Sequence, residues 1–239
     1  MDNQVKEAFS HLATAYANTV DTENLYNSAY ERPAMLQQLE SDLSGQEILD
    51  AGCAAGWYSS ELLKRGASVT ACDGSEEMVA AAKNRLQGQG NVICLNLEEP
   101  LPFPDQSFDT IVSSLTLHYI KDWRGLFSEC KRVLKPGGTF LFSVHHPFTD
   151  IRLLENPNYF AVERIVDHWT KDGKTVAVPF YRRSLQEIVN DTTTWFSLEK
   201  IIEPEPTEEF RVRNERTYEK LLKAPAFLLV KARKGDYPS

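Results

Sequence analysis

Residues 48–78 decide the fold of this chain and read ILDAGCAAGWYSSELLKRGASVTACDGSEEM. An apolar run is followed by a turn of small residues, a helical segment closed by Gly66, and a second apolar run that ends at Asp73. Strand, tight turn, helix and strand in this order are typical of a nucleotide-binding βαβ unit. Small residues in the turn allow the backbone to approach a ligand closely.

The spacing of glycines in the turn discriminates between two kinds of nucleotide site. A dinucleotide site needs G-x-G-x-x-G, and counting from Gly52 puts Ala54 and Trp57 where the second and third glycines belong. The frame D-x-G-x-G-x-G fits better, because it matches Asp50, Gly52 and Gly56 and leaves only Ala54 in a glycine position. The turn therefore favours a different adenosine-containing cofactor over a dinucleotide.

Asp73 ends the second strand about 20 positions after the first glycine of the turn, and an acid at this spacing accepts hydrogen bonds from ribose hydroxyls. Helix and strand patterns continue to alternate beyond it. Strands are predicted at 46–51, 67–73, 91–97, 108–115 and 139–146, with helices at 56–66, 76–87 and 122–135. Such alternation predicts an α/β fold with a parallel sheet and helices on both faces.

The flanking segments have other patterns. Helices are predicted at 5–17, where Phe9, Leu12 and Tyr16 share one side, and at 33–43. Two extended segments within 159–184, around an Asp172-Gly173 turn, predict a hairpin insertion. A helix at 184–193, a strand at 195–203, mixed loop and helix at 206–223 and a last strand at 225–234 follow.

Composition restricts the class of partner. The 239 residues carry a net charge of −8, which argues against general affinity for nucleic acid. We expect no signal peptide and no membrane-spanning segment. The cysteines Cys53, Cys72, Cys94 and Cys130 are scattered, so the sequence supports neither a disulfide framework nor a metal site, and it indicates a cytoplasmic protein.

Three stretches together resemble one family. The turn, the segment VTACDGSEEMVAAAKNR and the segment LNLEEPLPFPDQSFDTIVSSLTLHYIKDWRGLFSECKRVLKPGGTFLFSV resemble the class I S-adenosylmethionine-dependent methyltransferases, in particular the small-molecule type related to ubiquinone/menaquinone C-methyltransferases. The resemblance covers about Tyr30 to Val144. It implies a Rossmann-like, mostly parallel sheet of seven strands with the last strand antiparallel, and a hairpin insertion after the fifth strand.

The resemblance also implies one domain and a cofactor site. Residues 1–45 would form a helical cap, 46–146 the cofactor-binding core, 147–183 an insertion or lid, and 184–239 the rest of the sheet. The cofactor would be S-adenosyl-L-methionine and the product S-adenosyl-L-homocysteine. The predicted cofactor-binding residues are Tyr30, Arg32, Asp50, Gly52, Cys53, Ala54, Gly56, Trp57, Asp73, Gly74, Met78, Asn96, Leu97 and Ser113.

Within that set the implied roles differ. The backbone of 52–56 would approach the methionine moiety, and Arg32 could pair with its carboxylate. Asp73 would bind the ribose, with Gly74 and Met78 beside the adenine. Asn96 stands where the family often has an aspartate facing the adenine amine, and its carbonyl oxygen can still accept that hydrogen bond.

The catalytic residues stay open at this point. His118 follows the fourth strand, and His145 and His146 end the fifth, so all three are candidates at the rim of the site. A neutral histidine could take a proton from a nucleophile. His145 and His146 are adjacent, and we expect only one of them to face the pocket.

The insertion 147–183 is predicted to form the lid of the acceptor pocket, with Arg182 and Arg183 attracting an anionic acceptor. Its aromatic surface would come from Tyr159, Phe160, Trp169, Phe180 and Tyr181. The predicted function is in-line methyl transfer to a nucleophile on a small molecule. Oxygen, nitrogen and carbon nucleophiles all stay possible, as do a monomer and a homodimer. The alternatives are a non-catalytic cofactor-binding adaptor and an NAD(P)-dependent oxidoreductase.

Overall fold

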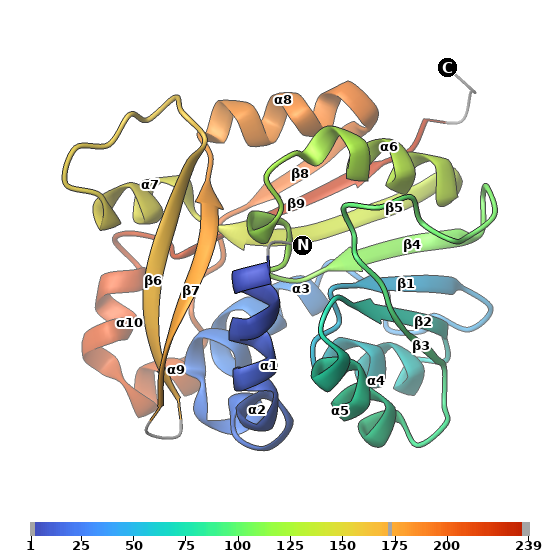
Figure 1. The fold of residues 1–239 in the computed structure, drawn as a ribbon, viewed down its shortest axis with the longest axis horizontal. Coiled ribbons are helices and arrows are strands. Elements are labelled where there is room, and N and C mark those ends of the chain that lie inside the picture. Colours follow the sequence, from blue (N-terminus) through green and yellow to red (C-terminus); the bar gives the residue numbers. More distant parts are fainter. Residues whose placement is uncertain (1–2, 172–173, 236–239) are drawn as a thin grey trace.

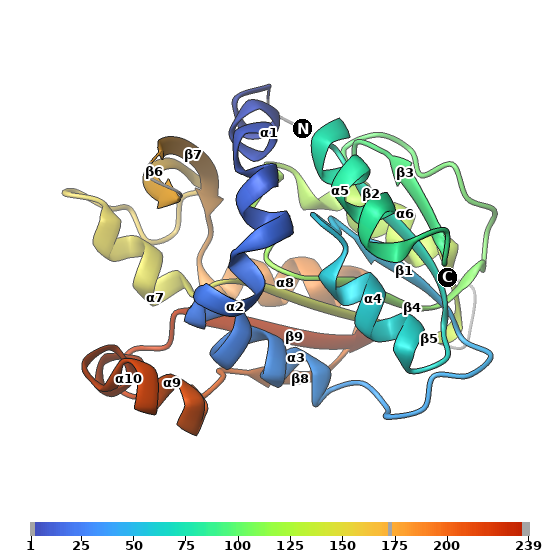
Figure 2. The ribbon, with the colours of Figure 1, turned by 90° about the horizontal axis from the view of Figure 1, so that it is seen from below.

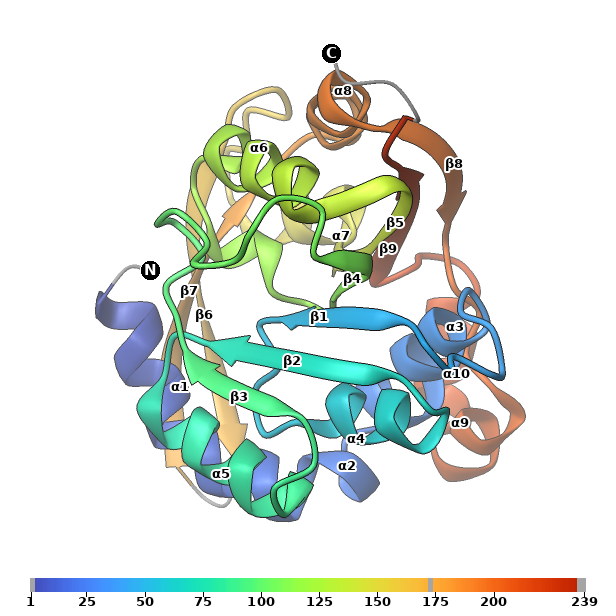
Figure 3. The ribbon, with the colours of Figure 1, turned by 90° about the vertical axis from the view of Figure 1, so that its right-hand side faces the viewer.

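The computed structural model describes residues 3–171 and 174–235, so the predicted Asp172-Gly173 turn lies outside the described residues. A seven-stranded sheet has the order β3-β2-β1-β4-β5-β9-β8 (Figure 3). Its strands are β1 (Glu47–Ala51), β2 (Ser68–Asp73), β3 (Asn91–Cys94), β4 (Phe108–Ser113), β5 (Leu134–His145), β8 (Ser197–Ile202) and β9 (Phe227–Arg233). Strands β1 to β5 pair in parallel, while β9 runs antiparallel between β5 and β8. The predicted fold class is confirmed.

Helices cover both faces of this sheet, as the alternation predicted (Figures 1 and 3). On one face lie α3 (Arg32–Leu36), α4 (Trp57–Lys64) and α5 (Glu76–Leu86), and on the other lie α6 (Trp123–Val133) and α8 (Leu185–Trp195). The central strands are apolar on both sides because each side is buried under helices. Ser75 and Ser184 cap α5 and α8 by accepting backbone N–H groups.

Helix α3 is shorter than the predicted helix 33–43 and ends at Leu36. The Arg65 side chain donates hydrogen bonds to the backbone oxygens of Leu36 and Glu40, at 3.3 and 3.2 Å. The backbone N–H of Leu43 donates to the carbonyl oxygen of Arg65 at 2.7 Å, and the Leu43 side chain is buried. The tertiary partner Arg65 therefore satisfies carbonyls that a longer helix would have paired internally.

Before α3 the chain forms α1 (Asn3–Asn18), α2 (Val20–Glu23) and a π-helical turn (Asn27–Glu31). Figures 1 and 2 show α1 between α5 and the hairpin. Val5, Ala8 and Leu12 on its apolar side share a buried cluster with Met78 of α5. Helix α1 is thus fixed by apolar packing against the core.

The predicted hairpin is confirmed as β6 (Glu163–Lys171) and β7 (Lys174–Arg182), which form a separate two-stranded antiparallel sheet. It is reached through α7 (Pro147–Asp150) and the 3-10 turn Ile151–Leu153. The 3-10 turn Leu117–Tyr119 follows β4, and α9 (Glu208–Arg213) and α10 (Glu215–Leu221) lie between β8 and β9. Across 3–171 and 174–235, none of the helices has both the length and the apolar character to cross a bilayer.

Candidate active site

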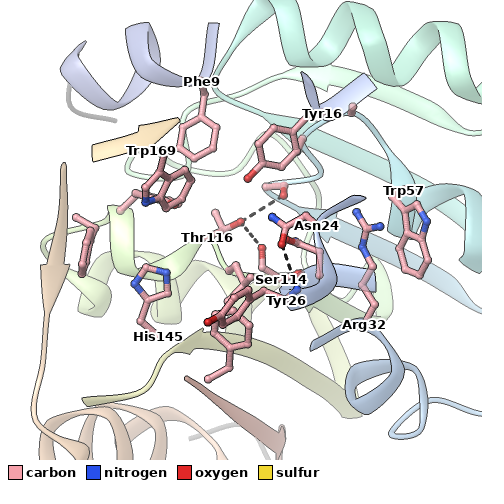
Figure 4. Close-up of a pocket in the computed structure, with 18 of the residues that line it drawn as sticks. Phe9, Tyr16, Asn24, Tyr26, Arg32, Trp57, Ser114, Thr116, His145 and Trp169 are labelled. Atoms are coloured by element: carbon pink, nitrogen blue, oxygen red, sulfur yellow. Dashed lines mark hydrogen bonds between the residues drawn. The ribbon is translucent and has the colours of Figure 1, made fainter. Parts of the chain in front are cut away.

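A cavity of about 500 Å³ is bounded by the ends of β1, β2, β4 and β5, by α1 and by the hairpin. Figure 4 shows two ends of this cavity: Arg32 and Trp57 lie at one, His145 and Trp169 at the other, with Ser114 and Thr116 between them. We call the first the arginine end, which also includes Asp21 and Arg85. The second is the histidine end, which consists of His145, Asp150, Asp167, Trp169 and Phe180.

The small-residue turn lines the cavity with its backbone. Gly52 has a φ of +84°, and a Cβ there would lie 2.2 Å from Oγ1 of Thr116, so only glycine fits. Ala54 also has a positive φ, +46°, which residues other than glycine rarely adopt. In this conformation the Ala54 backbone N–H donates to Oδ2 of Asp73 at 2.9 Å. The sequence left open whether Ala54 needs a positive φ, and it does.

Asp73 ends β2 and lines the cavity beside the turn. Its Oδ1 accepts the backbone N–H of Ser75 at 2.9 Å, while Oδ2 accepts that of Ala54. Burial raises the pKa of the Asp73 carboxyl, and these backbone N–H groups act in the opposite direction. A carboxylate has about four lone-pair sites, so Asp73 keeps capacity for ligand hydroxyls.

The arginine end holds two cations and one anion. Nη2 of Arg32 donates to Oδ1 of Asp21 at 2.9 Å, and Nη2 of Arg85 donates to Oδ2 at 2.5 Å. The Arg32 guanidinium also lies over the ring of Trp57, 4.0 Å from its centroid. Nε and Nη1 of Arg32 and Nη1 of Arg85 are buried without a hydrogen-bond partner. Because buried donors are normally paired, these atoms indicate an anionic ligand group.

Six of the fourteen predicted cofactor residues line the cavity, namely Arg32, Gly52, Cys53, Ala54, Trp57 and Asp73. Three others support the cavity from beneath. Asp50 accepts a hydrogen bond from Oγ of Ser59 at 2.5 Å, Ser113 donates to the carbonyl oxygen of Ala51 at 2.8 Å, and the hydroxyl of Tyr30 accepts the backbone N–H of Ala226 at 3.0 Å.

The remaining predicted cofactor residues are Gly56, Gly74, Met78, Asn96 and Leu97, which the cavity lining does not include. Gly56 begins α4 with a φ of +78°. Met78 is fully buried under α1, and Leu97 packs in the core against the α6 face. The Asn96 amide donates to Oε1 of Glu99 and accepts from the Glu98 backbone, so it stabilises its own turn.

The three histidine candidates occupy different environments. His145 lines the cavity, and its ring packs edge-on against Phe180, with centroids 4.7 Å apart. His118 stacks on His145, with centroids 3.9 Å apart, and both its ring nitrogens are buried without a partner. His146 is fully buried, where Nδ1 accepts the Phe148 backbone N–H and Nε2 contacts Glu203 at 2.9 Å. Of the three, only His145 faces the cavity.

Burial at the histidine end favours the uncharged forms of His145 and Asp150. Burial lowers the pKa of the His145 imidazole to about 4, so the ring is neutral at pH 7. Nδ1 of His145 lies 3.5 Å from Oδ1 of Asp150. Burial raises the pKa of the Asp150 carboxyl to about 8. The pair thus holds one proton between a carboxyl group and a neutral imidazole near neutral pH.

Arg182 and Arg183 do not line the cavity, contrary to the role in acceptor attraction suggested by the sequence. Arg182 is fully buried and donates to Oε2 of Glu163 at 2.7 Å and to three backbone carbonyls of residues 158–161. Arg183 lies over the ring of Trp123 and donates to the backbone oxygens of Ile120 and Lys121. Both side chains turn away because buried carbonyls bind them.

Several lining residues were absent from the predicted set. They include Phe9, Tyr16, Asp21, Asn24, Arg85, Thr116, Tyr119, Asp150 and Asp167. Ser114 also lines the cavity, and the resemblance had placed it with Ser113 under the sulfonium end of the cofactor. The helical spacing that places Phe9 and Tyr16 on one side of α1 was a usable signal. Burial raises the pKa of the Tyr16 hydroxyl to about 12, and charges on Arg32 and Asp73 also act on it. Nothing in the sequence alone indicated where α1 docks.

Comparison with known proteins agrees with this fold and site. Residues 49–142 match the family model described as a methyltransferase domain. A solved S-adenosylmethionine-dependent methyltransferase from Mesorhizobium loti is 27% identical, with a TM-score of 0.69, covering 85% of this chain and 97% of that chain. An uncharacterised protein of Haemophilus influenzae is 32% identical over 229 residues, covering 88% of this chain and 89% of that protein.

The parallel sheet with its antiparallel last strand, the small-residue turn and the acid after β2 define a class of protein, the Rossmann-like S-adenosylmethionine-dependent methyltransferases. The chain belongs to the class I family of these enzymes. A demethylmenaquinone methyltransferase of Tropheryma whipplei is 33% identical over 135 residues. This match covers 56% of each protein, so the chain spans little more than half the length of that relative.

The residues of the cavity fit the cofactor of this family, S-adenosylmethionine. Its methionine end carries a carboxylate, which the unpaired Arg32 donors suit, and an ammonium group, which Asp21 suits. The free lone pairs of Asp73 suit ribose hydroxyls. Gly52, which admits no side chain, leaves the backbone open to close approach.

Proposed function

We propose that this cavity binds S-adenosylmethionine toward the arginine end and a small acceptor toward the histidine end, and that the methyl group passes in line to a nucleophile of the acceptor. One observation carries the proposal. A single cavity joins unpaired cationic donors at the arginine end to a neutral, buried imidazole at the histidine end. Its volume of about 500 Å³ suits small molecules and leaves no room for a macromolecular segment beside the cofactor.

The methionine and ribose parts of the cofactor each have a partner in this proposal. Arg32 binds the methionine carboxylate, and the ring of Trp57 holds the guanidinium in place. Asp73 accepts the ribose hydroxyls, and Tyr16 of α1 offers an aromatic face beside it. When bound, the cofactor supplies a methyl group activated by its positively charged sulfur.

The protein then contributes position and proton transfer. Aligning the acceptor with the methyl group replaces a bimolecular encounter by a reaction within one complex. His145 receives the acceptor's proton, because its neutral ring faces the cavity and can accept hydrogen bonds. Asp150 orients that ring through Nδ1. Helix α1 and the hairpin keep water away from the reacting groups.

Calorimetric titration with S-adenosylhomocysteine and with NADPH tests the cofactor half of the proposal. We expect S-adenosylhomocysteine to bind and NADPH not to bind. Arg32→Leu should weaken S-adenosylhomocysteine binding by about 10- to 100-fold, because it removes a charge-assisted pair. Arg211→Leu, on the exposed side of α9, is the matched control and should leave the affinity unchanged. Tight binding of NADPH alone would instead support the oxidoreductase alternative.

Transfer of a labelled methyl group to an acceptor library tests the catalytic half. We expect His145→Gln, which keeps a polar side chain of similar reach, to lower kcat by about 10²- to 10⁴-fold while leaving cofactor affinity intact. His168→Gln on the outer side of the hairpin is the control. Cofactor binding without transfer to any acceptor would favour the adaptor alternative.

A further inference from the structure

The charged groups around the cavity are unevenly distributed. The lining cations, Arg32 and Arg85, both belong to the arginine end, where Asp21 pairs with them. The histidine end is lined by two carboxyl groups, Asp150 and Asp167, and by no lysine or arginine among the described residues. An anionic acceptor would therefore meet the negative charge of Asp167 and, among the described lining residues, no cation to attract it at this end.

The Asp150 carboxyl is buried without a counter-ion. The residue is 5% exposed, and its side chain makes one polar contact among the described residues, the 3.5 Å approach to Nδ1 of His145. The cation whose charge acts on it, Arg182, is already bound by Glu163 and backbone carbonyls. Burial raises the pKa of this carboxyl to about 8, so it is protonated at pH 7 unless a cation lies beside it. A bound cation would lower that pKa and pair with the ionised carboxylate.

Asp167 approaches the same end from strand β6 of the hairpin. Its Oδ2 accepts the indole N–H of Trp169 at 2.9 Å, and its Oδ1 accepts the backbone N–H of His168 at 2.8 Å. Its negative charge acts on both His145 and Asp150. The ring of Trp169 packs edge-on against Phe9, with centroids 6.5 Å apart, and both rings line the cavity.

Aromatic faces complete this end. Phe9, Tyr119, Trp169 and Phe180 line the cavity together with the two carboxyl groups. The faces of aromatic rings attract cations, and an ammonium group enclosed by rings and carboxylates is bound by both effects. A phenol or alcohol could donate a hydrogen bond to Asp150 but would bring no positive charge to pair with the two carboxyl groups.

Building on the proposed function, we infer that the acceptor is a small basic amine, bound as its ammonium ion between Asp150, Asp167 and the surrounding aromatic rings. The family model ends at residue 142, before all four of Asp150, Asp167, Trp169 and Phe180. The choice of acceptor is therefore a property of this chain's insertion.

The transfer step balances for such an acceptor. The ammonium ion first gives one proton to His145, which passes a proton from Nδ1 to the Asp150 carboxylate 3.5 Å away, because that carboxyl has the higher pKa. This leaves a neutral amine with a free electron pair. The amine nitrogen forms a bond to the methyl carbon as the carbon–sulfur bond breaks, and that bond's electron pair stays on sulfur. The products are a methylated ammonium ion, S-adenosylhomocysteine and the protonated Asp150 carboxyl, which returns its proton to solvent.

Three probes of one skeleton test the inference at pH 7.5: phenethylamine, 2-phenylethanol and phenylacetate. Each is titrated into protein already saturated with S-adenosylhomocysteine, and binding is followed by calorimetry. We expect phenethylamine, which is charged at this pH, to bind about tenfold tighter than 2-phenylethanol or more, and phenylacetate to bind most weakly.

Two variants test whether Asp150 and Asp167 cause the preference for the amine. Asp150→Asn and Asp167→Asn should each bring the affinity for phenethylamine to within about threefold of that for 2-phenylethanol, because each removes a carboxyl group that is negatively charged when the ammonium ion is bound. Glu155→Gln, an exposed residue that does not line the cavity, is the charge-matched control and should keep the full preference. Circular dichroism and S-adenosylhomocysteine affinity show whether each variant is folded.

The outcomes separate this inference from the proposed function. Failure of the wild-type protein to bind S-adenosylhomocysteine overturns both. Normal S-adenosylhomocysteine binding with equal or tighter binding of phenylacetate or 2-phenylethanol overturns the amine alone, as does absence of phenethylamine binding. A preference for the amine that survives both aspartate substitutions also overturns it, because the carboxyl groups would not be its cause.

Discussion

Ala54 is the residue at which the turn departs from glycine, and its φ of +46° gives that departure a cost. A left-handed conformation costs an L residue about 1–2 kcal/mol, and replacing Ala54 by glycine would remove this cost. Glycine also has more conformational freedom in the unfolded chain, which destabilises the folded state by about 0.5–1 kcal/mol. We therefore expect Ala54→Gly to raise the free energy of unfolding by about 0.5–1 kcal/mol in urea titrations.

The protein should bind S-adenosylhomocysteine with either alanine or glycine at position 54. The backbone N–H of Ala54 holds Asp73, and the substitution keeps that group, so S-adenosylhomocysteine affinity should change by less than about tenfold. Gln87→Gly is the matched control, because Gln87 has a φ of +49° at the end of α5, outside the cavity lining. A much larger gain in affinity for Ala54→Gly would mean that the alanine methyl obstructs the cofactor.

Asp50 links stability to pH. Burial raises the pKa of its carboxyl from 3.8 to about 7, so the folded state keeps a proton that the unfolded state releases as pH rises above 3.8. The resulting stabilisation is fully present below pH 3.8 and is lost as pH rises through 7. The loss over this window is on the order of 4 kcal/mol, at about 1.4 kcal/mol for each pKa unit.

Asp50→Asn should remove the part of the loss of folding stability at rising pH that comes from Asp50. Between pH 4 and pH 8 the free energy of unfolding of the wild-type protein should fall more steeply than that of the variant, measured by urea denaturation at each pH. Asp150 titrates in the same direction and is unchanged in both proteins, so the difference between them isolates Asp50. Exposed Asp42→Asn should keep the wild-type slope, and parallel curves for Asp50→Asn would contradict the prediction.

Among the elements, the β6–β7 hairpin contributes Asp167, Trp169 and Phe180 to the histidine end of the cavity, and Arg182 anchors it. Its guanidinium joins Glu163 at the start of β6 to the carbonyls of the preceding loop. Arg182→Ala would leave these groups buried and unpaired, which should cost about 3–5 kcal/mol in the free energy of unfolding.

The effect of Arg182→Ala should be confined to one end of the cavity. Hydrogen exchange in β6 and β7 should quicken and phenethylamine binding should weaken, whereas S-adenosylhomocysteine should bind as before. Arg152→Ala, which removes an exposed arginine from the same insertion, should change stability by no more than about 0.5 kcal/mol. Equal loss of cofactor and acceptor binding would show that the hairpin supports the whole cavity.

At the scale of the whole molecule, the two ends of the cavity come from different kinds of structure. The turn and Asp73 belong to the sheet core, which the family model covers. The histidine end combines the end of β5 with α7 and the hairpin, and α1 closes the gap between the hairpin and α5 (Figures 1 and 2). On the proposed function, cofactor binding thus depends on the core and the acceptor preference on the insertion.

The sequence by itself determined the sheet, the helices that cover it and the position of the small-residue turn. Strand and helix periods are local, and a cap such as Ser75 acts over a few positions, so these features can be recognised without the fold. Helix α3 marks the limit of such local signals, because the distant Arg65 side chain ends it.

The tertiary structure alone decided which side chains share the cavity. Phe9, Asp150 and Trp169 meet there from segments far apart in the sequence, while Met78 and Arg182 turn away from it. Where α1 and the hairpin dock depends on long-range apolar packing and buried hydrogen bonds, which no local pattern encodes. For that reason the cofactor end could be predicted largely from the turn, whereas at the histidine end the sequence predicted aromatic residues such as Trp169 and Phe180 but not the carboxyl groups of Asp150 and Asp167.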